Sequence, residues 1–135
     1  MANALYDKGR ESFLKGEISW DGDDIKAVLV DTNLYMVNLA TDQFLSDIPV
    51  GARVATSGNF STKTTTAGVA DADDVTFPAV TGATVEAVVV YQDTGVAGTS
   101  RLVGYIDTAT GLPATPGGGD ITVVWSSGAS KIFKL

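Results

Sequence analysis

Short apolar runs separated by turn-forming residues fill the chain from Gly51 onward, and this pattern restricts the possible folds more than any other feature. Alternation of apolar and polar residues is typical of strands with one buried face. Thr-Gly dipeptides beginning at Thr81, Thr94 and Thr110 stand between the runs, where glycine provides the backbone conformations that turns need. The pattern predicts a mainly β fold with strands at residues 52–57, 59–66, 75–77, 85–92, 101–107, 121–125 and 131–133.

The segment before Gly51 mixes helical and strand patterns. Residues 3–14 favour a short amphipathic α-helix with Asn3 as its N-cap, and Gly16 is placed to end this helix. Residues 17–20 and 25–30 then predict a β-hairpin. Residues 38–46 favour a second short helix.

The length of the chain and the spacing of its turns predict a single domain over residues 1–135, with residues 1–16 as an N-terminal helical segment. Neither a long linker nor a repeat of solenoid period divides the sequence. Many short strands joined by turns are typical of an antiparallel β-sandwich or a barrel-like domain. This is the fold class that we expect.

The absence of cysteine and histidine from the sequence excludes several kinds of site. Disulfides, thiolate metal sites, thiol nucleophiles and histidine-based catalytic triads cannot be built from the residues present. Neither a Ser-x-x-Lys motif nor a Gly-x-Ser-x-Gly motif occurs. We therefore expect a protein that is not an enzyme and that has no catalytic residue, cofactor or metal.

Sixteen acidic and nine basic residues give the chain a formal charge of −7, which repels phosphate backbones, so nucleic acid is not an expected partner. The acidic clusters at residues 21–24 and 71–74 do not match a calcium-binding loop, and we interpret both as turns.

No apolar run approaches the length of about eighteen residues that a transmembrane helix needs, so no membrane contact is expected. No signal-peptide pattern is present, which predicts synthesis in the cytoplasm.

Five aromatic residues allow two interpretations: Trp20, Tyr35, Tyr91, Tyr105 and Trp125. Exposed side by side, they could stack on a sugar. Tyr91, Tyr105 and Trp125 lie in or at the ends of apolar strands, where one face of the strand points into the core. Packing in the core is the interpretation that we favour for most of them.

Six segments of the sequence resemble segments of a family of small tailed-bacteriophage proteins. They are spread over nearly the full length of the chain: residues 4–10 (ALYDKGR), 25–32 (IKAVLVDT), 47–54 (DIPVGARV), 68–77 (GVADADDVTF), 105–113 (YIDTATGLP) and 119–125 (GDITVVW). The resemblance implies a structural protein of the phage virion, and it brings no catalytic residue with it.

Within that class, we expect a capsid decoration (cement) protein that binds the head surface and bridges major capsid subunits, so that the chain is located in the virion after its synthesis in the host cytoplasm. A neck, tail or fibre component is the alternative within the class. A carbohydrate-binding module that recognises a host-surface glycan is the alternative outside it. The expected partners are the major capsid protein and copies of the chain itself in a homo-oligomer. The expectation of a trimer rests on how capsid decoration proteins commonly sit at three-fold positions.

Apolar residues near both ends of the sequence are the candidates for contacts between subunits. They are Leu5, Tyr6, Phe13, Leu14, Ile132, Phe133 and Leu135. The alternative for both segments is that they close the core of their own domain.

Overall fold

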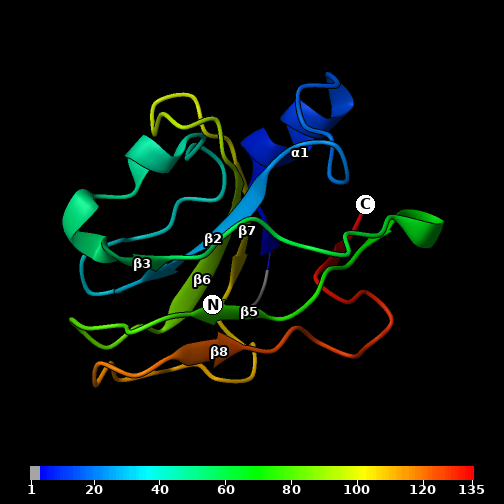
Figure 1. Cartoon of the computed structure of the whole chain (residues 1–135). Coiled ribbons are helices and arrows are strands. Elements are labelled where there is room, and N and C mark those ends of the chain that lie inside the picture. The colour runs from blue at the N-terminus through cyan, green and yellow to red at the C-terminus, as the bar shows by residue number, and fades with distance from the viewer. Residues whose placement is uncertain (1–3) are drawn as a thin grey trace.

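The computed structural model of the chain describes residues 4–135, in which strand (31%) exceeds helix (13%), so the prediction of a mainly β fold is confirmed. The main sheet is antiparallel, with the strand order β1-β7-β6-β2-β3 (Figure 1). Its strands are β1 (Ala4–Leu5), β2 (Ile25–Val30), β3 (Arg53–Thr56), β6 (Ala87–Gln92) and β7 (Leu102–Ile106).

Two small antiparallel sheets complete the β structure. One pairs β4 (Val69–Ala70) with β9 (Phe133–Lys134), and the other pairs β5 (Val75–Phe77) with β8 (Ile121–Val123). Within residues 4–135 the sheets do not close into a barrel, and a two-sheet sandwich is not confirmed.

The main sheet is covered on both faces, which explains why its central strands are apolar almost throughout. One face packs against the small sheets, through Ala27, Leu29, Val88, Val90 and Val103. The other face packs against residues 31–52, through Val28, Val30, Ala87, Val89 and Leu102. Every residue of β6 is buried. A strand buried on both sides has no solvent face on which polar residues would alternate.

Helix α1 (Asp7–Leu14) packs on β7 at very short range. A Cβ atom at Gly9 would lie 2.7 Å from the carbonyl oxygen of Leu102, so only glycine allows this approach. The helix ends in a Schellman motif, in which Gly16 adopts φ of 73° and the N–H groups of Gly16 and Glu17 donate to the carbonyls of Phe13 and Ser12. The prediction that Gly16 ends the helix is confirmed. The predicted start at residue 3 is wrong, because the helix begins at Asp7 with Tyr6 as its N-cap, and Ala4–Leu5 form β1 on the edge of β7 instead. Asn3 itself lies outside the described residues.

The predicted hairpin of residues 17–20 and 25–30 is wrong, because β2 pairs with β3 and β6 instead. Residues 19–23 form a turn in which the Asp23 carboxylate accepts hydrogen bonds from the Ser19 N–H (2.8 Å) and from Gln92 Nε2 (2.6 Å). Trp20 is buried in the core and donates its indole N–H to the carbonyl of Asp71 at 3.2 Å. The apolar residues of this segment therefore fill the core from a turn.

The predicted second α-helix at residues 38–46 is also wrong. The segment instead contains an isolated turn and the start of the 3₁₀ helix η1 (Leu45–Asp47). A second 3₁₀ helix, η2 (Val50–Ala52), follows it. The Asn38 side chain accepts from the Ala40 N–H, and the Asp42 carboxylate accepts from the Asn38 N–H. Such side-chain bonds to nearby N–H groups compete with helix formation.

The predicted strand at residues 59–66 is wrong, since only Thr64 in it makes a bridge, to Asp71. The hydroxyls of Ser61 and Thr62 donate instead to the Asp73 carboxylate, and Thr62 has a positive φ of 55° that interrupts an extended chain. The 3₁₀ helix η3 (Thr66–Gly68) follows. The strand predicted at residues 131–133 is β9, which begins two residues later and ends one residue later, at Phe133–Lys134.

A chain of buried hydroxyls lies in the face of the core that residues 31–52 cover. Tyr35 donates to the Asp42 carboxylate at 2.7 Å, and the Tyr6 and Tyr35 hydroxyl oxygens are 2.8 Å apart, so the Tyr6 hydroxyl donates to that of Tyr35. Burial raises the pKa of both tyrosines above the ordinary value of 10.0.

This hydroxyl chain predicts a loss of stability at alkaline pH. The unfolded chain releases tyrosine protons near pH 10 while the folded protein retains them, so the free energy of unfolding should fall as pH rises above about 10. Each retained proton contributes a slope of about 1.4 kcal/mol per pH unit. Tyr35→Phe removes one such group. The free energy of unfolding of this variant, measured by urea unfolding at several pH values between about 9 and 11, should therefore fall less steeply with pH than that of the wild type. Equal slopes for the two proteins would contradict the assignment.

Candidate functional site

The two predicted contact segments lie side by side in the structure. The rings of Phe13 in α1 and Phe133 in β9 are 5.8 Å apart. Next to them is an apolar groove of ≈ 370 Å³, here called the terminal groove, which is lined by Leu5, Arg10, Phe13, Leu14, Lys134 and Leu135. Residues far apart in the sequence thus build one surface.

The predicted contact residues divide into three levels of burial. Leu14 and Leu135 are exposed, with 88% and 62% of their surface accessible. Phe13 and Phe133 are half-buried. Leu5, Tyr6 and Ile132 are buried in the core, and of these only Leu5 lines the terminal groove. The structure therefore leaves Leu14 and Leu135 as the side chains most available to another molecule.

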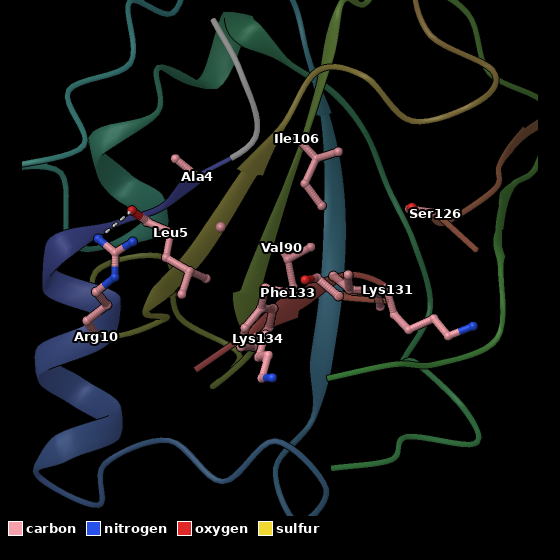
Figure 2. Close-up of a pocket in the computed structure, with 12 residues that line it drawn as sticks. Ala4, Leu5, Arg10, Val90, Ile106, Ser126, Lys131, Phe133 and Lys134 are labelled. Atoms are coloured by element: carbon pink, nitrogen blue, oxygen red, sulfur yellow. Dashed lines mark hydrogen bonds between the residues drawn. The ribbon is translucent and has the colours of Figure 1, made fainter. Parts of the chain in front are cut away.

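Positive charge gathers at the edge of the terminal groove. A neighbouring pocket of ≈ 340 Å³ shares Leu5, Arg10 and Lys134 with the groove and is also lined by Lys131. Figure 2 shows Arg10 and Leu5 at one side of this pocket and Lys131 at the other, with Phe133 and Lys134 between them. The pocket lining includes three of the nine basic residues of the chain and no carboxylate side chain.

Arg10 is held in place at this edge by two contacts. Its Nη1 atom lies 3.0 Å from the Asp7 carboxylate and 3.4 Å from the carbonyl oxygen of Leu5 (dashed in Figure 2 for the latter). The ion pair with Asp7 is exposed, so it contributes little to stability. Its effect is to orient a cation beside an apolar groove.

A second apolar surface was not predicted from the sequence. Leu34, Met36 and Val50 are exposed by 57%, 91% and 77%. Leu34 lies against the backbone of η2, because a Cβ at Gly51 would be 3.9 Å from its Cδ1 atom. These three residues are here called the loop knob. The signal in the sequence was an apolar run at residues 34–37 that belongs to no predicted helix or strand.

The aspartates of residues 71–74 have structural roles, but the predicted turn is wrong, because Asp71 bridges Thr64 and residues 72–74 lead into β5 without a turn. The indole N–H groups of Trp20 and Trp125 donate to the carbonyls of Asp71 and Asp73, and the Trp125 backbone N–H donates to the Asp74 carboxylate at 2.9 Å. In the described part of the chain, no group of three or more acidic side chains is placed to hold a metal ion. No helix in residues 4–135 is long and apolar enough to cross a membrane.

All five aromatic residues considered for sugar stacking are buried: Trp20, Tyr35, Tyr91, Tyr105 and Trp125. The core interpretation of these residues is confirmed. Trp20 and Trp125 belong to a row of rings with centroid distances of 5.2 to 6.0 Å, which runs from Phe13 through Phe133, Trp20 and Phe60 to Trp125. Every other aromatic side chain between residues 4 and 135 is at least partly buried as well. A stacking surface for sugars would need exposed rings.

Comparison with known proteins adds no family assignment, since neither a protein-family model nor a curated protein matches the chain. The terminal groove is therefore interpreted from its own composition. An apolar concavity with two exposed leucines and basic residues at its edge has the properties of a protein-binding surface.

Proposed function

We propose that the chain is a non-enzymatic structural protein of a tailed-phage virion, and specifically a capsid decoration protein that binds the assembled head. The observation that carries this proposal is the exposure of Leu14 and Leu135 at the terminal groove. Exposed apolar groups gathered in one place are a feature of surfaces that bind proteins. The resemblance of the sequence to small tailed-phage proteins is the reason for proposing a virion as the place where this surface binds.

A decoration protein acts by binding, without chemistry. A ligand that binds the assembled lattice and not its free subunits stabilises the lattice by mass action, by about 2.7 kcal/mol at a concentration one hundred times its Kd. Such binding needs a domain that folds without its partner. Both faces of the main sheet are covered by other parts of the same chain, so the domain has a complete core of its own and its surface is available for contacts.

The proposal predicts selective binding to the assembled head. Purified protein should sediment with expanded heads that lack it, and its apparent affinity for them should exceed that for free major capsid subunits at least about tenfold, a difference of about 1.4 kcal/mol per binding event. Decorated heads should also withstand higher temperature than bare heads. Cosedimentation and thermal melts of the heads measure both effects.

Three outcomes would contradict the decoration role. Absence of the protein from purified virions would remove the proposal altogether. A low, fixed copy number at one vertex or on the tail, seen by cryo-microscopy, would assign the chain to the neck, tail or fibre instead. Equal binding to heads and to free subunits would show that no lattice-specific site is recognised.

A further inference from the structure

The pocket of ≈ 340 Å³ beside the terminal groove, here called the cationic pocket, has an apolar inner wall (Figure 2). Its lining side chains from the main sheet, Leu5, Val90 and Ile106, are buried. Gly104 also lines the pocket and is paired with Leu5 across β1 and β7, so the sheet has no side chain at this position to fill the space above it. The half-buried Phe133 of β9 lines the pocket from the C-terminal segment. An apolar space therefore remains between the main sheet and that segment.

The mouth of the cationic pocket carries positive charge. Its charged lining residues are Arg10, Lys131 and Lys134, and all three are exposed. Figure 2 shows them spread around the opening, with Arg10 on one side and Lys131 on the other. Neither lysine forms an ion pair with another residue in the range 4–135. A chain with a formal charge of −7 thus presents a local cluster of cations at one apolar pocket.

The carboxylates near this pocket do not cancel that charge. Asp7 lies 3.0 Å from Arg10 Nη1 and offsets one cation. Glu11 follows Arg10 in the sequence, but its carboxylate is 3.1 Å from Lys8 Nζ. Asp107 follows Ile106, and its side chain is not part of the lining. The charges of Lys131 and Lys134 therefore remain available to an anion.

Lys131 also lies where the cationic pocket meets a second pocket of ≈ 400 Å³, which is lined by hydroxyl groups that include those of Ser126 and Ser127. Its backbone has a positive φ of 48°, a conformation that few residues other than glycine adopt. The Lys131 N–H donates to the carbonyl of Gly128 at 3.2 Å, in a turn that holds this conformation. Strained residues that their surroundings hold in place are frequent at ligand-binding sites.

We propose that the cationic pocket binds a small organic anion, in which a carboxylate is attached to an apolar body. The carboxylate would lie at the mouth, beside Lys131 and Lys134, and the apolar body would cover the inner wall. An inorganic anion would leave that wall uncovered, and a neutral apolar molecule would gain nothing from the cations. An apolar cavity of about 150 Å³ holds benzene, so ≈ 340 Å³ has room for about ten to fourteen non-hydrogen atoms. This inference goes beyond the proposed function and does not depend on it, because it assigns a ligand to a pocket that head binding does not use.

The test compares three probes of matched structure: octanoate, its neutral amide octanamide, and acetate. Titrations of the ¹⁵N-labelled protein followed by nuclear magnetic resonance give the affinity and the place of binding together. Octanoate should bind with a Kd of about 1 mM or below, and octanamide and acetate should each bind at least about tenfold more weakly. The amide signals of Gly104, Ser126 and Ile132 should shift most. Raising the NaCl concentration from about 20 to about 500 mM should weaken octanoate binding and leave octanamide binding unchanged.

The variant that tests the charges is the double replacement Lys131→Gln and Lys134→Gln. Both side chains are exposed, so the variant should keep the melting temperature of the wild type while its affinity for octanoate falls at least about fivefold. The matched control is Lys8→Gln with Lys15→Gln, which changes the net charge equally and involves no residue of either pocket. This control should bind octanoate like the wild type.

Several results would overturn the assignment. Equal affinity for octanoate and octanamide would show that the pocket does not select for negative charge. Equal weakening in the two double variants would show that only the overall charge of the protein matters. Shifts confined to the signals of Leu14 and Leu135 would place the ligand in the terminal groove instead. Octanoate that does not bind below about 10 mM would leave the cationic pocket without the proposed ligand class, whereas the binding of the protein to phage heads would be unaffected by any of these results.

Discussion

Replacing Trp125 with alanine should lower the free energy of unfolding by about 3–5 kcal/mol, the range for large aromatic truncations in a core. The Trp125 ring packs 5.5 Å from that of Phe60, and its two N–H groups hold residues 73 and 74 in place. The change therefore removes both core volume and the hydrogen bonds that hold residues 73 and 74. Urea unfolding followed by circular dichroism measures the loss.

The matched variant for this position is Trp125→Phe, which keeps one six-membered ring and removes the five-membered ring of the indole together with its N–H. Because the carbonyl of Asp73 then loses its donor, we expect an intermediate cost of about 1–3 kcal/mol. A loss below about 1 kcal/mol for the alanine variant would show that the neighbouring rings repack around the gap and that the aromatic row is not a fixed part of the core.

Replacing Gly9 with alanine should destabilise the protein by about 1–3 kcal/mol, although alanine favours helices more than glycine does. The new methyl group would lie 2.7 Å from the carbonyl oxygen of Leu102, which is backbone of a buried strand and cannot turn aside. Helix α1 must therefore move away from β7. The measurement is thermal or urea unfolding of the two proteins.

Gly16→Ala provides the control for Gly9→Ala. Gly16 has a positive φ of 73°, and a Cβ atom added to it would have no neighbour within 4 Å, so its replacement introduces backbone strain without a clash. Gly9→Ala should therefore displace the helix from β7, whereas Gly16→Ala should leave the position of the helix on β7 unchanged. An unchanged or higher stability of Gly9→Ala would contradict the tight packing of α1 on β7.

The strands that the sequence predicts well are mostly those whose apolar residues are buried in the main sheet. Residues 25–30, 75–77, 85–92 and 101–107 correspond to β2, β5, β6 and β7, with ends that agree within two residues. The predicted turns at the Thr-Gly dipeptides are also present, since Gly82, Gly95 and Gly111 all have positive φ. Local residue preference and tertiary packing agree at these places.

The three wrong elements share a physical cause. At residues 17–20, 38–46 and 59–66, aspartate carboxylates, an asparagine amide and hydroxyl groups bond to nearby backbone or to each other. Whether such a side chain faces solvent or captures a backbone N–H depends on which distant segment packs beside it. Apolar spacing alone therefore predicts a regular element where the chain forms a turn.

The candidate site was predicted in part. The sequence indicates that the apolar ends of the chain are available for contacts, and the structure brings Phe13 and Phe133 together. It does not indicate that Leu5, Tyr6 and Ile132 are buried while Leu14 and Leu135 are exposed, because that division depends on the pairing of β9 with β4 and of β1 with β7. The loop knob is missed because an exposed apolar run in a loop has no periodic pattern.

The strand order of the main sheet has a consequence for how the chain reaches its folded state. Among the neighbouring strands of this sheet, only β6 and β7 are joined by a short loop, whereas residues 31–86 separate β2 from β6 and nearly the whole chain separates β1 from β7. Closing long loops costs entropy before any contact compensates for it, so the β6–β7 hairpin is the natural nucleus and the outer strands join later. Until β2 adds to it, the edge of β6 exposes the unpaired backbone of an entirely apolar run, Ala87–Val90, which another nascent chain could pair with. Addition of β2 to β6 within one chain therefore competes with aggregation while this protein is produced. Slower synthesis or lower temperature favours the addition of β2 over aggregation.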